Sequence, residues 1–65
     1  MKLREVKFKE IPVPYLSIFV DDKEIAFGLI GEVLRKIPIE CADYEIVSTN
    51  YFFEAYVIRL TSGKE

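Results

Sequence analysis

The sequence predicts a single small α+β domain over residues 1–65, in which a four-stranded, mainly antiparallel sheet carries one helix on one face in the order β-β-α-β-β. Three observations predict this fold class. Apolar and polar residues alternate with a period of two near both ends of the chain. In the middle of the chain the apolar residues recur with a period of 3.6 instead. The length of 65 residues suits one domain with one hydrophobic core.

The first two strands are expected in residues 1–10 and 15–20. In MKLREVKFKE, Val6 and Phe8 alternate with charged residues, which is the period of a half-buried strand. The stretch IPVP follows, and its two prolines remove backbone donors and hold the chain extended. We therefore expect a connector there, before YLSIFV resumes the alternation as the second strand.

The helix is expected over residues 22–37, because its apolar side chains gather on about half of a helical wheel and Pro38 ends the pattern. The acidic stretch DDKE at its start suits a helix cap. An alternative fits the same residues: FVDDKEIAF also suits a hairpin with Asp-Asp-Lys at its turn, which leaves only residues 29–37 helical. Gly28 and Gly31 weaken the longer helix by about 1 kcal/mol each.

The C-terminal third predicts a second hairpin. CADYEIVS alternates as a strand over residues 41–48, Thr49-Asn50 is placed where a tight turn would lie, and the last strand is expected over residues 51–61. The order of elements is similar to the β-grasp arrangement and to that of small bacterial immunoglobulin-binding domains. The resemblance implies that the first and last strands lie side by side in the middle of the sheet, and it implies no function.

Two faces of the sheet follow from the alternation. The face toward the helix is expected to hold the core residues Val6, Phe8, Leu16, Ile18, Val20, Ala42, Tyr44, Ile46, Tyr56, Ile58 and Leu60. The outer face is expected to carry Lys7, Lys9, Tyr15, Ser17, Phe19, Val47, Phe53, Ala55, Val57 and Arg59. Glu54 falls in the core row of the last strand, where an unpaired carboxylate is costly, so we expect a bulge or a position at the rim.

Few residues suit catalysis. The chain has no histidine and one cysteine, so we expect neither an enzyme nor a metal site nor a cofactor. We expect Cys41 to be structural, because burial and its acidic neighbours Glu40 and Asp43 raise a thiol pKa.

The acidic stretch Asp21, Asp22 and Glu24 lacks the glycine and the distal glutamate of a calcium loop, so helix capping is the expected role.

The apolar outer face predicts a protein-interaction module, most simply a homodimer or a subunit of a larger assembly. Its interface is expected to contain Tyr15, Phe19, Phe53, Ala55 and Val57. The alternative is a sheet that stacks single-stranded nucleic acid on its aromatic rings while basic residues contact phosphates, namely Lys7, Lys9 and Arg59. A third hypothesis, a small-molecule or enzymatic site that uses Glu54 and tyrosines, has no positive support in the sequence.

Net charge, hydropathy and composition indicate which binding partners and which cellular location to expect. The net charge of -2 and the pI of about 5.1 disfavour general binding to nucleic acid. The N-terminal stretch has no continuous apolar core, and no run approaches the length of a membrane span, so we expect a cytoplasmic protein that does not contact the membrane. The absence of glutamine and the abundance of charged residues resemble the composition of thermophilic proteins.

Overall fold

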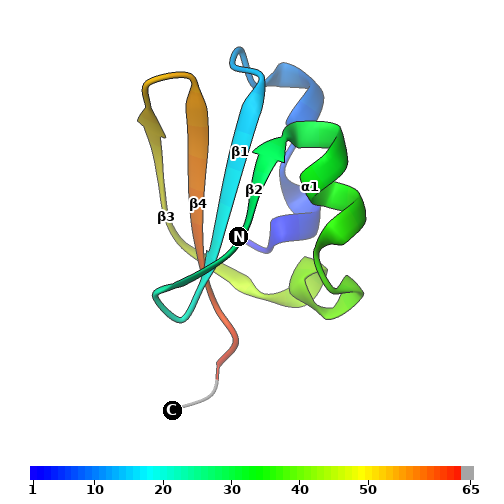
Figure 1. Ribbon diagram of the computed structural model, residues 1–65. Coiled ribbons are helices and arrows are strands. Elements are labelled where there is room, and N and C mark those ends of the chain that lie inside the picture. Colours follow the sequence, from blue (N-terminus) through cyan, green and yellow to red (C-terminus); the bar gives the residue numbers. More distant parts are fainter. Residues whose placement is uncertain (64–65) are drawn as a thin grey trace.

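The computed structural model describes residues 1–63, and it confirms an α+β fold with a four-stranded sheet and one α-helix (Figure 1). The elements follow in the order η1 (Leu3–Glu5), η2 (Phe8–Glu10), β1 (Tyr15–Val20), β2 (Lys23–Leu29), α1 (Ile30–Lys36), η3 (Ile39–Asp43), β3 (Glu45–Phe52) and β4 (Ala55–Thr61), where η denotes a 3-10 helix.

The sheet has the strand order β2-β1-β4-β3. The pairs β1–β2 and β3–β4 are antiparallel hairpins, and the central pair β1–β4 is parallel. The first and last strands of the structure, β1 and β4, therefore lie side by side in the middle of the sheet, and β1 takes the place that the element order implied for the strand expected over residues 1–10. The helix and the 3-10 segments lie on one side of the sheet (Figure 1).

Residues 1–10 were expected to form a strand, and this prediction is wrong. They form η1 and η2, and only Lys2 makes an isolated bridge with Glu45. Leu3 is buried, and Val6 donates its backbone N–H to the carbonyl of Leu3 at 3.1 Å. Residues three apart share one face of a 3-10 turn, so an apolar pattern that also fits a strand is buried here without pairing in the sheet.

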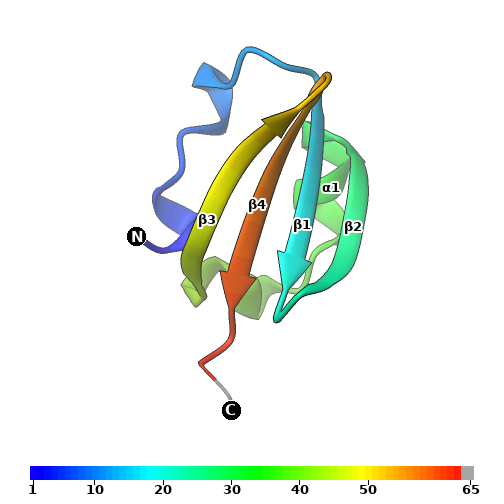
Figure 2. The same ribbon diagram turned by 90° about the vertical axis from the view of Figure 1, so that its left-hand side faces the viewer.

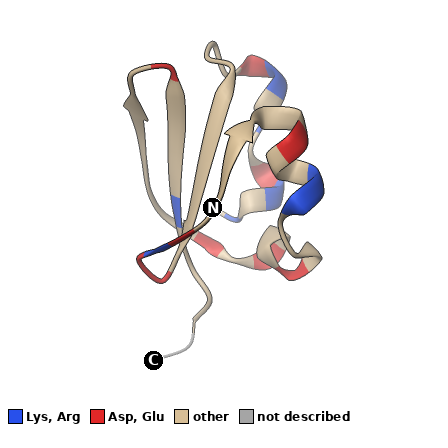
Figure 3. Ribbon diagram, viewed as in Figure 1, with Lys and Arg blue, Asp and Glu red and all other residues tan. Residues whose placement is uncertain are grey.

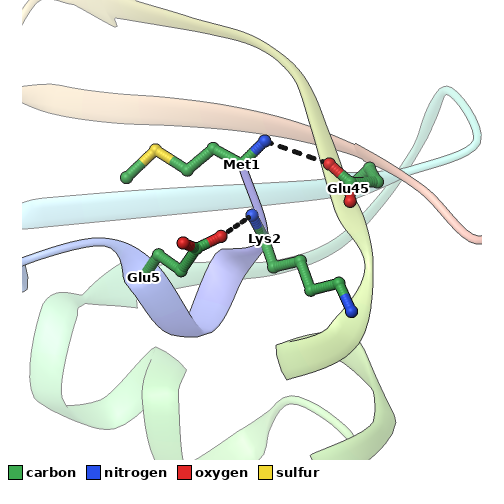
Figure 4. A network of polar contacts seen from close by, with 4 residues as sticks. All are labelled: Met1, Lys2, Glu5 and Glu45. Carbon is green, nitrogen blue, oxygen red and sulfur yellow. Dashed lines mark hydrogen bonds and ion pairs between the residues drawn. The ribbon is translucent and has the colours of Figure 1, made fainter.

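The N-terminal segment is tied to the edge strand β3 by polar contacts (Figure 4). The ammonium group of Met1 lies 3.0 Å from Oε2 of Glu45, and the backbone N–H of Ile46 donates to the carbonyl of Met1 at 2.8 Å. Glu5 accepts from the backbone N–H of Lys2 at 2.7 Å. These contacts cover the beginning of an edge that would otherwise be unpaired.

The predicted helix over residues 22–37 is also wrong, and the alternative hairpin is confirmed. Asp21 and Asp22 occupy the β1–β2 turn with φ of 50° and 69°, a pair of positive values typical of a tight hairpin turn. They therefore do not cap a helix. The α1 helix has seven residues and begins only at Ile30, because Lys23–Leu29 pair with β1.

The turn of the second hairpin lies at Phe53-Glu54 and not at the predicted Thr49-Asn50. Thr49 and Asn50 are paired within β3. This strand begins at Glu45, because the preceding residues form η3, and it contains a bulge between Ile46 and Ser48. The later turn shifts β3 along the chain and shortens the last strand, which was expected over residues 51–61, to the seven residues of β4.

The hydrophobic core lies between the sheet and α1, and the alternation in the central strands predicted it correctly. Its buried side chains are Leu3, Leu16, Ile18, Val33, Cys41, Ile58 and Leu60. Half-buried Val6, Phe8, Val20, Tyr44, Ile46 and Tyr56 pack against them, as expected. The expected core residue Ala42 lies in η3 and is half-buried.

Candidate functional site

The candidate site is the outer face of the sheet, the face opposite α1. No helix lies in front of the strands in the view onto this face (Figure 2). The pairing places its side chains in three rows across β2, β1, β4 and β3. These rows are Leu29-Tyr15-Ala55-Phe52, Phe27-Ser17-Val57-Asn50 and Glu24-Phe19-Arg59-Ser48. Charged residues gather on the helical segments and at the turns, and most of the strand surface is uncharged (Figure 3).

An open groove of about 840 Å³ lies on this face. Its floor is formed by small residues in the central strands, where Ser17 is 3% and Ala55 is 8% exposed. Its rim carries large aromatic side chains, with Phe27 60%, Phe52 62% and Phe53 87% exposed. The outer face is thus a trough with a shielded floor and a rim of apolar rings in contact with solvent.

The rim rings support one another in pairs. Tyr15 of β1 stacks on Phe27 of β2, with ring centroids 5.9 Å apart. Phe52 and Phe53 meet edge to face at the other side of the groove, with centroids 4.5 Å apart. Such arrangements are the favoured geometries of aromatic pairs. Each of these rings therefore packs against a neighbouring ring on the same face.

Phe53 occupies a strained position. Its φ is 56°, in the left-handed region that costs a bulky residue about 1–2 kcal/mol and favours glycine or asparagine. The side chain is almost fully exposed, so burial does not offset this cost. Phe53 is the first residue of the two-residue turn between β3 and β4, and such a turn requires a positive φ there, so the hairpin imposes this conformation on an aromatic residue.

Two polar side chains in the groove, Ser17 and Arg59, have partners within the face. The hydroxyl of Ser17 donates to Oε2 of Glu24 at 2.6 Å. The guanidinium carbon of Arg59 lies 4.6 Å from the centroid of Phe19, a cation–π contact that holds the side chain against the sheet. An oxygen of Asp22 approaches Nη1 of Arg59 only to 4.0 Å.

Glu54 is exposed in the β3–β4 turn and borders the groove, which agrees with the expected rim position.

The structure brings together most of the residues that the sequence singled out. Tyr15, Phe19, Phe53, Ala55, Val57 and Arg59 all line the groove. Lys7 and Lys9 do not: Lys7 borders a second depression beside the N-terminal segment, and Lys9 lies in η2. Val47, expected on the outer face, lies at the bulge of β3 and borders that second depression as well.

Two rim residues were missed. Phe27 had been assigned to the helix, and Phe52 to the face that meets the helix. Phe27 was missed because β2 was expected to be helical, and Phe52 because the later turn places it in β3, opposite Ala55, and not in the last strand. The alternation of Ile25, Phe27 and Leu29 is the signal that places Phe27 on a strand.

The reactive groups outside the groove have structural surroundings. Cys41 is buried, and burial, with a smaller contribution from Glu40, raises the pKa of its thiol. The carboxylate of Asp43 pairs with Arg4.

Within residues 1–63, no three side chains of the metal-binding types come together. Of the acidic stretch, Asp21 accepts hydrogen bonds from the backbone N–H and the hydroxyl of Ser62, at 3.2 and 2.6 Å.

No protein-family model, curated protein or solved structure matches the chain. In the part of the chain that the structure describes, no helix has the length and apolar character needed to cross a membrane. The geometry of the outer face is therefore the basis for a functional proposal.

Proposed function

We propose that this domain is a small cytoplasmic protein-interaction module whose outer sheet face binds another protein, in a homodimer or as a subunit of a larger assembly. The observation that carries the proposal is Phe53, an aromatic side chain that is 87% exposed on strained backbone at the rim of an apolar groove. The folded monomer gains little from this residue. A partner that covers the ring would supply the missing burial.

The size of the chain supports the same proposal. A domain of this length buries only about 60% of the surface that its unfolded chain exposes, so a partner adds stability that a single core cannot supply. The exposed rings of Phe27, Phe52 and Phe53 offer apolar area for that purpose. Rigid, paired aromatic rings also lose little conformational freedom on binding.

The proposal includes no catalytic role and no cofactor. Ser17 and Glu24, the closest pair of polar side chains in the groove, hydrogen-bond to each other. The chain contains no histidine to act as a general base near neutral pH.

The test is the molar mass of a double variant, Phe27→Ser with Phe52→Ser. Both side chains are exposed, so the variant should keep the circular dichroism spectrum of the folded wild type and lose self-association. The matched control is Ile39→Ser, because Ile39 is an apolar residue that is 93% exposed in η3, away from the groove. If the double variant associates as tightly as the wild type, the outer face is not the interface.

A second candidate function, binding of single-stranded nucleic acid, is supported by one arrangement. Arg59 stacks over Phe19 on a face that carries several exposed aromatic rings, which is the combination that bases and phosphates require. The charges weigh against it, because Glu24 and Glu54 border the same groove and the two predicted lysines do not.

A gel-shift titration with short oligonucleotides at low salt tests the second candidate. Binding that weakens steeply with added salt would support it, since phosphate contacts release counterions. The absence of any shift at low salt would remove it. The double variant of Phe27 and Phe52 serves as the control, because stacking requires the rings.

A further inference from the structure

We propose that the partner is a second copy of this chain, bound face to face about a two-fold axis that runs across the strands at the middle of β4. In this arrangement β4 of one copy crosses β4 of the other in the opposite direction. Each Arg59 then meets Glu54 of the second copy. The inference rests on the proposed function, and it adds the identity of the partner and its orientation.

The positions of the two charges on β4 suggest this axis. Glu54 precedes the first residue of β4 and Arg59 lies near its end, and both border the groove. They are five residues apart, about 16 Å at 3.3 Å per residue. The midpoint between them falls between Tyr56 and Val57. A two-fold axis there places each charge over the opposite charge of the other copy, twice in one interface.

The other aligned way to stack two identical sheets is less favourable. An axis parallel to the strands keeps the ends of both β4 strands together, which brings Arg59 near Arg59 and Glu54 near Glu54. Like charges that face each other across an interface destabilise it. The axis across the strands avoids both repulsions. It also keeps the strand axes of the two sheets close to antiparallel, which is within the range of aligned sheet packing.

Both charges are available for this contact. Among the described residues no cation lies within 4.0 Å of the Glu54 carboxylate. Arg59 is held over the sheet by Phe19. Its Nη1 lies 4.0 Å from Oδ1 of Asp22, whose side chain is 97% exposed. Such an exposed ion pair adds little stability, so Arg59 loses little when it pairs with Glu54 of the second copy instead.

The apolar residues agree with the same axis. Because β1 runs parallel to β4 and in register with it, with Tyr15 opposite Ala55 and Phe19 opposite Arg59, the axis brings Tyr15 of one copy toward Phe19 of the other. The exposed ring of Phe53 then extends toward the Arg59 end of the second copy. Rings that are exposed in one copy would therefore be covered in the pair.

The size of the face places the proposed dimer among the smaller interfaces. The molecule measures 32 × 20 × 19 Å, so its broad face offers on the order of 600 Å² per copy. This is the lower end of the range for specific interfaces, where weak and transient complexes are found, so we expect a dissociation constant in the micromolar range.

Charge reversal tests the orientation. In a homodimer of Glu54→Arg, the new arginine of one copy faces Arg59 of the other, and in a homodimer of Arg59→Glu, the new glutamate faces Glu54. The dissociation constant of each variant homodimer should therefore be at least roughly tenfold higher than that of the wild type. Mixed in equal amounts, the two variants restore both opposite-charge pairs, and heterodimers should form more tightly than either homodimer. Sedimentation velocity at one total concentration measures all three samples, and circular dichroism checks folding.

The matched control is a pair of reversals on the helix side of the sheet. Glu10→Arg in η2 and Lys36→Glu in α1 change the net charge by the same amounts at exposed positions. They should leave dimerisation unchanged, both alone and mixed.

The outcomes separate the two proposals. Weak homodimers with a restored mixture support the orientation. Single reversals that dimerise like the wild type, or a mixture that stays as weak as its components, overturn the orientation and leave the outer face as a binding surface. A wild-type protein that is monomeric at high concentration overturns the second copy as the partner, and with it the homodimer form of the proposed function.

Discussion

The guanidinium group of Arg59 lies over the ring of Phe19, 4.6 Å from its centroid, on two neighbouring parallel strands. Among residues 1–63, Arg59 is the only cation that lines the groove, and this contact holds it over a ring of the neighbouring strand. It also covers part of Phe19, which is half-buried although no other layer covers the outer face. Arg59 is therefore both a packing residue of the monomer and a charge presented at the proposed interface.

Arg59→Ala should lower the free energy of unfolding by about 0.5–1 kcal/mol, the usual contribution of an exposed cation–π contact. Arg59→Lys should retain part of this, since an ammonium group is still attracted by the ring but does not stack on it. Urea unfolding of the dilute monomer measures both. An Arg59→Ala variant as stable as the wild type would show that the contact does not hold the side chain.

Phe53→Gly should have opposite effects on folding and on association. Glycine adopts the left-handed conformation freely, so the variant should raise the stability of the dilute monomer by about 1 kcal/mol. Loss of the exposed ring should weaken dimerisation. Urea unfolding and sedimentation, each on the same samples, give the two values. A variant that loses monomer stability would mean that Phe53 serves the fold and not the interface.

The β1–β2 turn should respond to Asp22 in a similar way. Asp22 has φ of 69°, so Asp22→Gly should stabilise the protein by about 0.5–1 kcal/mol, whereas the β-branched Asp22→Val should destabilise it by a similar or larger amount. Thermal unfolding distinguishes the two directions. Equal effects of glycine and valine would contradict the turn geometry and favour the discarded longer helix.

The buried thiol of Cys41 makes stability depend on pH at the alkaline end. Burial first, and Glu40 second, raise the pKa of Cys41 above its ordinary value of 9.0. The unfolded chain therefore loses this proton at lower pH than the folded chain does. The contribution is fully present below the pKa of the unfolded thiol and declines as the pH rises toward the folded pKa.

Unfolding measured from pH 7 to about 11 should show this decline, and Cys41→Ala should reduce it. Part should remain, because burial and the neighbouring Glu40, Cys41 and Asp21 also raise the pKa of Tyr44. Alkylation by iodoacetamide gives an independent measure, since folded Cys41 should react more slowly than the urea-unfolded chain. Equal reaction rates would contradict a buried thiol.

The core was predictable because alternation in the central strands admits one solution. Leu16 and Ile18 in β1 are two positions apart, as are Ile58 and Leu60 in β4, and each pair faces the helix. A slip of one residue would expose all four.

The turns and the N-terminal segment were harder to predict, for different reasons. Phe53-Glu54 contains neither glycine nor asparagine, so local preference pointed to Asn50 instead. In the other hairpin, Ala26, Phe27 and Leu29 also fall on the apolar side of a helical wheel that continues to Ile37, and a short run does not separate the two periods. At the N-terminus, Leu3 and Val6 are three residues apart, which suits one face of a 3-10 turn, but the same segment also has the alternation of a strand.

Much of the candidate site followed from the sequence in spite of these errors. Tyr15, Phe19, Ala55 and Val57 line the groove because they lie on the face opposite the core, in β1, which has its predicted bounds, and in the part of the predicted last strand that forms β4. Lys7 and Lys9 were misplaced because they depended on a first strand that does not form. Which aromatic residues form the rim depends on where the two hairpin turns lie, and the position of those turns is set by the tertiary structure.

The molar mass of the wild-type protein, measured by light scattering over a range of concentrations, tests the central claim most directly. The chain has a mass of 7.6 kDa, and we predict a mass that rises toward twice this value through the micromolar range. A mass that stays at 7.6 kDa up to roughly 100 μM, well above the affinity expected for an interface of this size, would contradict a dimer formed through the outer face.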